Sequence, residues 1–265
     1  MQHKPKKTAI IGAGNLGSAI ALGFIKSGYL QAAAIHITRR SANKLEALSS
    51  KGFITGSSNT EATENADVVI LAVKPWQIAD VLSQIKPALK KEAIIVSLAA
   101  GITLNDLSQT VNNHPLFRVI PNTAIAIGQS MTCISSQYAS DNDIAVVNEL
   151  FQQVGDVMMI PENLMPAVTV IASCGTAYAL RYLHASAQGG VESGIKPADA
   201  IHLAAQTMKG AAELILASGN HPEAEIDKVT TPGGITIKGL NEMEHQGFSS
   251  SIIKGMMTAM KSMQK

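Results

Sequence analysis

The sequence contains little cysteine and few aromatic residues. Two of its 265 residues are cysteines, Cys133 and Cys174, and aromatic residues make up 4% of the chain. No CxxC spacing is present, and no histidine pair has the spacing of a metal site. A disulfide framework and a bound metal are therefore not expected. We expect both cysteines to be ordinary buried thiols.

Charge of one sign and long apolar runs are also lacking. Charged residues make up 15% of the chain, the formal net charge is +1, and the basic residues are scattered. Nucleic acid and anionic membranes are therefore unfavoured as partners. No uninterrupted apolar run reaches the roughly 20 residues of a bilayer span. The start, MQHKPKKTAIIGAG, lacks a signal-peptide cleavage site. We expect a soluble, cytoplasmic protein.

A buried strand followed by glycines opens the first half. Residues 8–11, TAII, predict a short strand, and the helical pattern SAIALGFIKSG begins shortly after it. Between them, Gly12 allows a tight turn, Gly14 lets a pyrophosphate approach the backbone, and Gly17 lets helix and strand pack closely. N–H groups at the helix start would face the phosphates. This order predicts a dinucleotide site at Gly12, Ala13, Gly14, Asn15, Leu16 and Gly17.

The end of the second strand indicates which dinucleotide binds. This strand is expected at residues 34–38, and it ends without the Asp or Glu that usually holds the ribose 2′-hydroxyl. Thr38, Arg39 and Arg40 stand there instead, and guanidinium groups suit a 2′-phosphate. We expect NADPH to be preferred and NADH to be possible. A solvated arginine pair at a helix start is the alternative.

Strands and helices alternate through the rest of the first half. Their lengths are those of βα units, with helices expected at 41–52 and 59–65 and strands at 53–54, 67–73, 93–98 and 116–120. This alternation predicts a Rossmann-like, doubly wound and mostly parallel α/β sheet. The loops that close these strands, which include Lys74-Pro75, are expected at the ligand-binding edge.

The pattern changes after Pro161. Stretches rich in Ala, Leu, Ile and Met with a 3.6-residue period predict helices at 176–193, 197–217 and 249–263. Glycine and proline predict helix breaks at 194–197 and 218–222. We therefore expect a Rossmann-like domain at 1–161 and an all-α domain at 162–265. Several of these helices are apolar nearly all round, and a domain of this size cannot bury them alone. The sequence therefore predicts a homo-oligomer, at least a dimer, through the helical domain.

A turn with little side-chain bulk lies near the C-terminus, in TTPGGITIKGLNEME at 230–244. Thr231 places a hydroxyl at a capping position before a proline and two glycines, which predicts a helix start. Free N–H groups there would bind a carboxylate, and Thr236 adds a second hydroxyl. An ordinary capped helix with a flexible entry is the alternative.

The chain resembles the pyrroline-5-carboxylate reductase family nearly end to end. The segments that carry the resemblance are IGAGNLGSAIALG, ADVVILAVKP, SLAAGI, RVIPNT, GTAYAL, GGVESGI, AAQTMKGAAEL, SGNHP and TTPGGITIKGLNEME. The resemblance implies an NAD(P)H-dependent reduction of the C=N bond of 1-pyrroline-5-carboxylate to L-proline, the last step of proline biosynthesis.

The resemblance also assigns residues to the site. Beyond the glycine motif, it implies that the dinucleotide is lined by Asn59, Ala72, Val73, Lys74, Pro75 and Ala100. It implies that the cyclic imino acid is held by Thr231, Gly233, Gly234, Ile235 and Thr236. Hydride addition to the ring carbon leaves negative charge on nitrogen, so a donor is needed there. Thr236 is the candidate.

The sequence departs from the family's pattern at several positions. Thr231 stands where Ser is commoner, Ile235 where Thr or Ala is usual, and Trp76 where Gln is common. The segments RVIPNTA and ASCGTAY also differ from their usual forms. A non-catalytic NADP(H)-sensing protein is therefore one alternative.

A β-hydroxyacid dehydrogenase is the other alternative. The string GITIKGLN at 234–241 resembles the GxxxKxxN helix of that family, with Lys238 as the acid/base. In that family the string opens the first long helix of the second domain. This chain has Ser173-Cys174-Gly175-Thr176 at that place, without a lysine.

Overall fold

The computed structural model describes residues 5–41 and 45–263. The chain forms two compact units, Met1–Ser173 and Cys174–Lys265. The division expected after residue 161 falls inside the first unit. Residues 162–173 form a 3₁₀-helix, η6 (Glu162–Leu164), the short helix α7 (Met165–Val168) and most of a π-helix at Thr169–Cys174.

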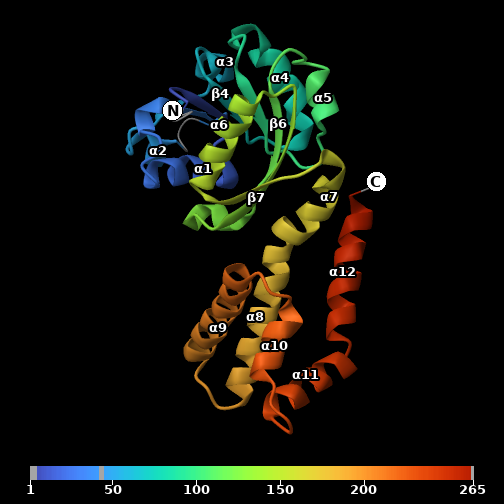
Figure 1. The fold of residues 1–265 in the computed structure, drawn as a ribbon. Coiled ribbons are helices and arrows are strands. Elements are labelled where there is room, and N and C mark those ends of the chain that lie inside the picture. The colour runs from blue at the N-terminus through green and yellow to red at the C-terminus, as the bar shows by residue number, and fades with distance from the viewer. Residues whose placement is uncertain (1–4, 42–44, 264–265) are drawn as a thin grey trace. The chain divides into compact units, whose positions relative to one another are not determined.

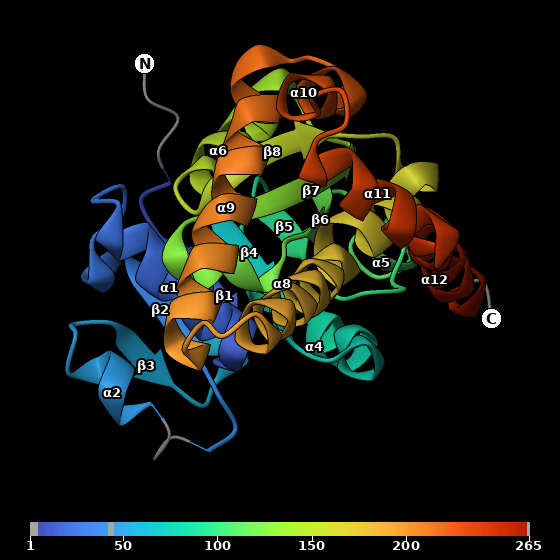
Figure 2. The same cartoon turned by 90° about the horizontal axis from the view of Figure 1, so that it is seen from below.

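An eight-stranded sheet forms the centre of the first unit (Figure 1). Its strands are β1 (Thr8–Ile11), β2 (Ile35–Thr38), β3 (Ile54–Gly56), β4 (Val68–Leu71), β5 (Ile94–Ser97), β6 (Leu116–Ile120), β7 (Ser130–Gln137) and β8 (Gly155–Met159). Figure 2 shows their spatial order, β3-β2-β1-β4-β5-β6-β7-β8. Of the pairings in this sheet, β6 with β7 is antiparallel and the others are parallel. The predicted doubly wound, mostly parallel sheet is confirmed.

The side chains of the central strands are buried on both faces of the sheet. Strands β1, β2, β4 and β5 are buried at every residue, as strands of a sheet covered on both sides must be. Because side chains alternate along a strand, Ile10 packs into one core while Ala9 and Ile11 pack into the other. Strand β1 lies between β2 and β4, so the order of the strands reverses beside it. Open α/β sheets bind ligands at such a point.

Helices cover the two faces of the sheet. The first core is closed by α1 (Asn15–Lys26) and α6 (Asp141–Gln152), where the rings of Phe24 and Phe151 meet edge to face. The second is closed by α3, α4 and α5. The shorter elements of this unit are α2 (Glu46–Ser49), α3 (Asn59–Thr63), α4 (Ile78–Ile85), α5 (Leu104–Ser108), η1 (Ala32–Ala34), η3 (Pro75–Gln77), η4 (Lys86–Ala88) and η5 (Thr123–Ile127). Within the helix expected at 41–52, residues 42–44 lie outside the described residues, and the observed helix is α2.

The second unit is helical, as predicted (Figure 1). Its helices are α8 (Gly175–Glu192), α9 (Pro197–Ser218), α10 (Pro222–Val229), α11 (Ile235–His245) and α12 (Phe248–Ser262). The expected breaks follow from backbone chemistry. Gly219 ends α9 in the left-handed region with φ +65°, and prolines occupy the first positions of α9 and α10.

The second unit leaves much apolar surface uncovered. Among its described residues, the buried hydrophobic side chains are those of Ala187 and Ala200. Large apolar side chains are exposed along three helices: Leu180 on α8, Leu203, Leu214 and Leu216 on α9, and Ile253 on α12. The single chain therefore provides this unit with very little core of its own.

One described stretch, Glu162–Glu192, has the length and apolar composition of a membrane span, by those two measures alone.

The two cysteines differ in their surroundings. Cys133 on β7 is buried, and burial raises the pKa of its thiol. Cys174 is only partly buried, so the expectation of a buried thiol is wrong for this residue. It lies at the end of the π-helix and is the first residue of the second unit.

Candidate active site

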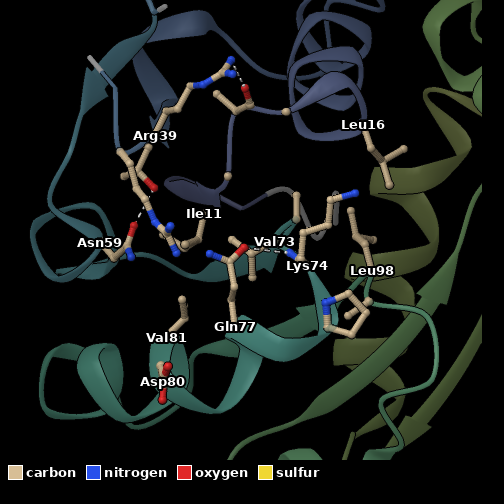
Figure 3. A pocket seen from close by; sticks show the side chains of 18 of the residues that line it. Ile11, Leu16, Arg39, Asn59, Val73, Lys74, Gln77, Asp80, Val81 and Leu98 are labelled. Carbon is tan, nitrogen blue, oxygen red and sulfur yellow. Dashed lines mark hydrogen bonds between the residues drawn. The ribbon is translucent and has the colours of Figure 1, made fainter.

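A cavity of about 1230 Å³ lies in the first unit, at the carboxyl ends of four neighbouring strands. Its walls come from the loops after β1, β2, β4 and β5 and from one face of α4 (Figure 3). Of the residues expected to contact a dinucleotide, all except Gly17 line it: Gly12, Ala13, Gly14, Asn15, Leu16, Thr38, Arg39, Arg40, Asn59, Ala72, Val73, Lys74, Pro75 and Ala100. Tertiary structure thus brings residues from five separate segments into one site.

The three glycines of the loop have three different surroundings. A Cβ on Gly12, whose φ is +112°, would lie 2.7 Å from the carbonyl oxygen of Ala72. A Cβ on Gly17 would lie 2.1 Å from the carbonyl oxygen of Gly12, so this glycine allows helix and loop to touch. A Cβ on Gly14 would meet nothing within 4 Å. Gly14 therefore presents bare backbone to open space, as a bound pyrophosphate requires.

The start of α1 supplies an anion site beside Gly14. Gly14 caps this 12-residue helix and provides no side-chain cap, and the first turn contains no acidic residue. The first N–H groups of a helix lack partners within the helix, and the helix dipole adds partial positive charge there. Because Gly14, Asn15 and Leu16 all line the cavity, these groups are available to a phosphate.

The end of β2 holds the glycine loop in place. The carbonyl oxygen of Thr38 accepts the N–H groups of Gly12 at 3.1 Å and Ala13 at 2.7 Å. The guanidinium of Arg39 donates to the carbonyl oxygen of Ala13 at 2.9 Å (Figure 3). Arg40, the next residue, is exposed at the cavity wall. The two arginines that the sequence treats as a pair therefore have different surroundings.

A chain of hydrogen bonds crosses the cavity wall from β2 to α4. The Thr38 hydroxyl donates to Oδ1 of Asn59 at 2.7 Å, and Nδ2 of Asn59 donates to Oε1 of Gln84 at 3.0 Å. Gln77 accepts the backbone N–H of Lys74 at 3.2 Å and so fixes the turn after β4 (Figure 3). Trp76 projects from this turn with 77% of its surface exposed. All five side chains line the cavity.

Sequence reasoning missed one wall of the cavity. Gln77, Asp80, Val81 and Gln84 line it from α4 and the turn before it, and Ser57 and Leu98 extend the wall. The signal was present, because positions 77, 80, 81 and 84 have the spacing of one helical face directly after Lys74-Pro75. Val81 is a buried core residue that also reaches the cavity.

The residues assigned to the imino acid form a turn in the second unit. Gly233 has φ +71°, which favours glycine. The cap of α11 is Gly234, not Thr231, so the predicted hydroxyl cap is wrong. The N–H of Gly234 donates to the Thr231 carbonyl at 2.9 Å, and a Cβ on Gly234 would lie 2.5 Å from Oγ1 of Thr231. The tight turn thus removes Thr231 from the capping position.

This turn leaves the first groups of α11 available to a ligand. The 11-residue helix has no side-chain cap, so its first N–H groups lack that partner. Ile235 is 88% exposed, and the Thr236 hydroxyl is exposed and makes no hydrogen bond with a described residue. The imino-acid residues and the dinucleotide residues are each assembled within their own unit.

Comparison with known proteins decides the family. A model described as "NADP oxidoreductase coenzyme F420-dependent" matches residues 7–101, and one for pyrroline-5-carboxylate reductase dimerisation matches residues 162–265. Pyrroline-5-carboxylate reductase 2 of Dictyostelium discoideum is 40% identical over 275 residues, which cover 97% of this chain and 92% of that protein. The chain belongs to the pyrroline-5-carboxylate reductase family.

Other members of the pyrroline-5-carboxylate reductase family agree. Pyrroline-5-carboxylate reductase 1 of D. discoideum is 41% identical over 95% of this chain, which spans about half, 48%, of that longer protein. The crystal structure of Plasmodium falciparum pyrroline carboxylate reductase with NADP bound is 27% identical. It has a TM-score of 0.89 and covers 98% of this chain and 97% of its own. The resemblance found in the sequence is confirmed.

Proposed function

We propose that this chain reduces the C=N bond of 1-pyrroline-5-carboxylate to L-proline with NADPH. The observation that carries the proposal is the cavity in the first unit, where the loop with its open face at Gly14 meets Thr38, Arg40 and Asn59. Family membership supports the reaction, and the NADP bound to the P. falciparum relative supports the cofactor. Bound NADPH supplies a hydride from C4 of its nicotinamide.

The chain's own groups fit each part of the dinucleotide. The N–H groups at the start of α1 bind the pyrophosphate, because Gly14 places no side chain between them and the ligand. Arg40 lies at the end of β2 with its guanidinium exposed, where a 2′-phosphate would accept two of its N–H groups. This contact favours NADPH over NADH, which lacks that phosphate.

The turn before α11 holds the imino acid in this proposal. The N–H groups at the start of α11 bind the substrate carboxylate. The Thr236 hydroxyl donates a hydrogen bond to the ring nitrogen as negative charge develops there. Because a Thr hydroxyl is a weak acid, it orients or relays a proton to an imine that is already partly protonated.

We also propose a homodimer through the second unit. The match of residues 162–265 to a dimerisation domain supports it, and so do the exposed apolar side chains of α8, α9 and α12. A second copy of the same unit would remove this apolar surface from water. Light scattering of the purified chain should give twice the mass of one chain or a multiple of that value. A monomer at all concentrations would contradict the proposal.

The first experiment measures initial rates of NADPH and NADH oxidation by the purified chain when 1-pyrroline-5-carboxylate is added. A reaction without the imine is the control. NADPH oxidation that yields proline is expected, at a rate above that with NADH. Binding of NADPH without turnover would contradict the proposed reaction and favour a sensing protein or another substrate.

A further inference from the structure

We infer that the two adjacent arginines at the end of β2 have different tasks. Arg39 is a positioning residue that holds the glycine loop for NADPH and NADH alike, and Arg40 is the arginine that distinguishes the two cofactors. The sequence suggests that both guanidinium groups bind the same phosphate. In the folded chain, however, only Arg39 makes a side-chain hydrogen bond to a described residue. The inference rests on the proposed function, because it takes the cavity to be the dinucleotide site.

Arg39 is already engaged with the loop. Its Nη1 donates to the carbonyl oxygen of Ala13 at 2.9 Å, while the N–H of Ala13 donates to the Thr38 carbonyl at 2.7 Å. Both polar groups of Ala13 are thus tied to the end of β2. The backbone N–H of Arg39 donates to the carbonyl of Gly56 at 3.1 Å, which anchors the arginine to β3. Arg39 is half-buried, as this arrangement requires.

This contact acts on a part of the site that both cofactors use. The loop presents Gly14 and the start of α1 to the pyrophosphate, which NADPH and NADH share. A charged donor on the Ala13 carbonyl limits the conformations of the loop before any ligand binds, and preorganisation of this kind raises affinity. Removing the Arg39 guanidinium should therefore weaken both cofactors by a similar factor.

Arg40 differs from Arg39 in both exposure and hydrogen bonding. It is exposed, it lines the cavity, and none of its donors bonds to a residue that the structure describes. The neighbouring Thr38 hydroxyl is occupied by Asn59, whose amide is in turn occupied by Gln84. Of the two arginines, Arg40 is therefore the one whose guanidinium no described residue engages, and the exposed Ser41 hydroxyl beside it also lines the cavity.

The test measures the dissociation constants of NADPH and NADH directly, without turnover. Trp76 is the chain's single tryptophan and lines the cavity, so its fluorescence reports binding through quenching and energy transfer to the reduced nicotinamide. The variants are Arg39→Gln, Arg39→Lys and Arg40→Gln. Lys91→Gln removes a charge from an exposed residue away from the cavity and is the matched control.

Arg40→Gln should raise the Kd of NADPH about tenfold or more and leave that of NADH within about twofold, because only NADPH loses a charged contact. Arg39→Gln should raise both Kd values by a similar factor of about five to twenty, and Arg39→Lys should restore part of the loss because Lys can still donate to a carbonyl. Lys91→Gln should change neither Kd.

Three results would overturn the inference. They are a loss in Arg39→Gln that is at least fivefold greater for NADPH than for NADH, no loss for either cofactor in that variant, or an equal loss for both in Arg40→Gln. If Arg39→Gln does not fold, the same comparison is made with Arg39→Lys, whose weaker bond to Ala13 should still affect both cofactors alike. Selective cofactor binding without imine reduction would refute the proposed reaction and leave this inference standing.

Discussion

The guanidinium of Arg118 on β6 lies 3.2 Å from the carboxylate of Glu162, with only 5% of the Arg118 side chain exposed. The same carboxylate oxygen accepts the N–H of Leu104, the first residue of α5, at 2.7 Å. Nε of Arg118 has no partner among the described residues. Glu162 is therefore the carboxylate paired with a buried positive charge, and it also accepts a hydrogen bond from the first turn of α5.

Replacing Glu162 should destabilise the first unit. Glu162→Ala leaves the Arg118 charge buried without its carboxylate, so we expect a loss of about 2–4 kcal/mol in the free energy of unfolding. Glu162→Gln keeps an acceptor for Leu104 and should lose less. Denaturant unfolding followed by circular dichroism measures the change. The control is Glu92→Ala, which removes an exposed carboxylate that has no bond to a described residue. Equal stability of the two alanine variants would contradict the role of Glu162.

Alanine substitutions at two glycines of the phosphate-binding loop should have separate effects, one on stability and the other on NADPH binding. Gly17→Ala forces a Cβ to within 2.1 Å of the Gly12 carbonyl oxygen, so the helix and loop must move apart and the melting temperature should fall. Gly14→Ala meets nothing within 4 Å and should change stability by about 1 kcal/mol or less, the cost of alanine at a helix cap. Its methyl group would nevertheless occupy the space that the pyrophosphate needs.

Thermal melts and cofactor titrations check this pair of variants. Gly14→Ala should fold normally and bind NADPH at least about tenfold more weakly, because a methyl group displaces the phosphate from its N–H donors. Unchanged NADPH affinity in Gly14→Ala would show that the pyrophosphate lies elsewhere. Normal stability of Gly17→Ala would show that the close contact can relax.

Removal of the Thr236 hydroxyl should slow the reaction without abolishing it. We expect Thr236→Ala to lower kcat/KM by about 10²-fold or less, the low end of general acid–base contributions. Thr236→Ser keeps the hydroxyl and should recover most of the loss. The control is Lys238→Ala, on the same helix, which should be normal here but inactive if the chain used the chemistry of a β-hydroxyacid dehydrogenase. Unchanged kcat/KM in Thr236→Ala would exclude this hydroxyl from the mechanism.

Acid should remove one specific contribution to the stability of the first unit. Partial burial acts to raise the pKa of Asp67, but hydrogen bonds from the Lys90 ammonium at 2.6 Å and from the N–H groups of Lys7 and Lys6 outweigh it. The pKa of Asp67 in the folded chain is therefore below its usual value. A carboxylate of this kind stabilises the fold above its unfolded pKa of about 3.9, and the contribution is lost as the pH falls through the folded pKa.

Melting temperatures of the wild type and Asp67→Asn, measured from about pH 6 down to about pH 3, test this linkage. The wild type should melt higher at the upper end, and the difference should shrink as Asp67 becomes protonated. Glu92→Gln is the control and should follow the wild type. A difference that is constant across the range would mean that the charge of Asp67 contributes nothing.

Several features were determined by the sequence alone, because they depend on local chemistry. The spacing of Gly12, Gly14 and Gly17 after an apolar strand is sufficient to predict the loop, since Gly17 must approach the Gly12 carbonyl and Gly14 must leave bare backbone for a phosphate. Proline and glycine positions predicted the helix breaks near Pro197 and Gly219 because their backbone preferences are intrinsic. The helical second unit followed from the 3.6-residue period of its apolar residues.

The tertiary structure decided what depends on contacts between distant segments. Strand β7 was missed because Ser130, Thr132 and Ser135 are polar, and they are buried only where neighbouring groups satisfy them. The fold also places one face of α4 in the site, because it brings Gln84 within hydrogen-bonding distance of Asn59 at the cavity wall.

Arg39 and Arg40 show the same difference between what the sequence determines and what the tertiary structure decides. The sequence places two guanidinium groups side by side and gives no reason to treat them differently. Only the folded chain brings the carbonyl of Ala13 within 2.9 Å of Arg39 and leaves Arg40 exposed at the cavity. Residue type fixes which bonds a side chain can form, and the partner it meets depends on where the rest of the chain has folded.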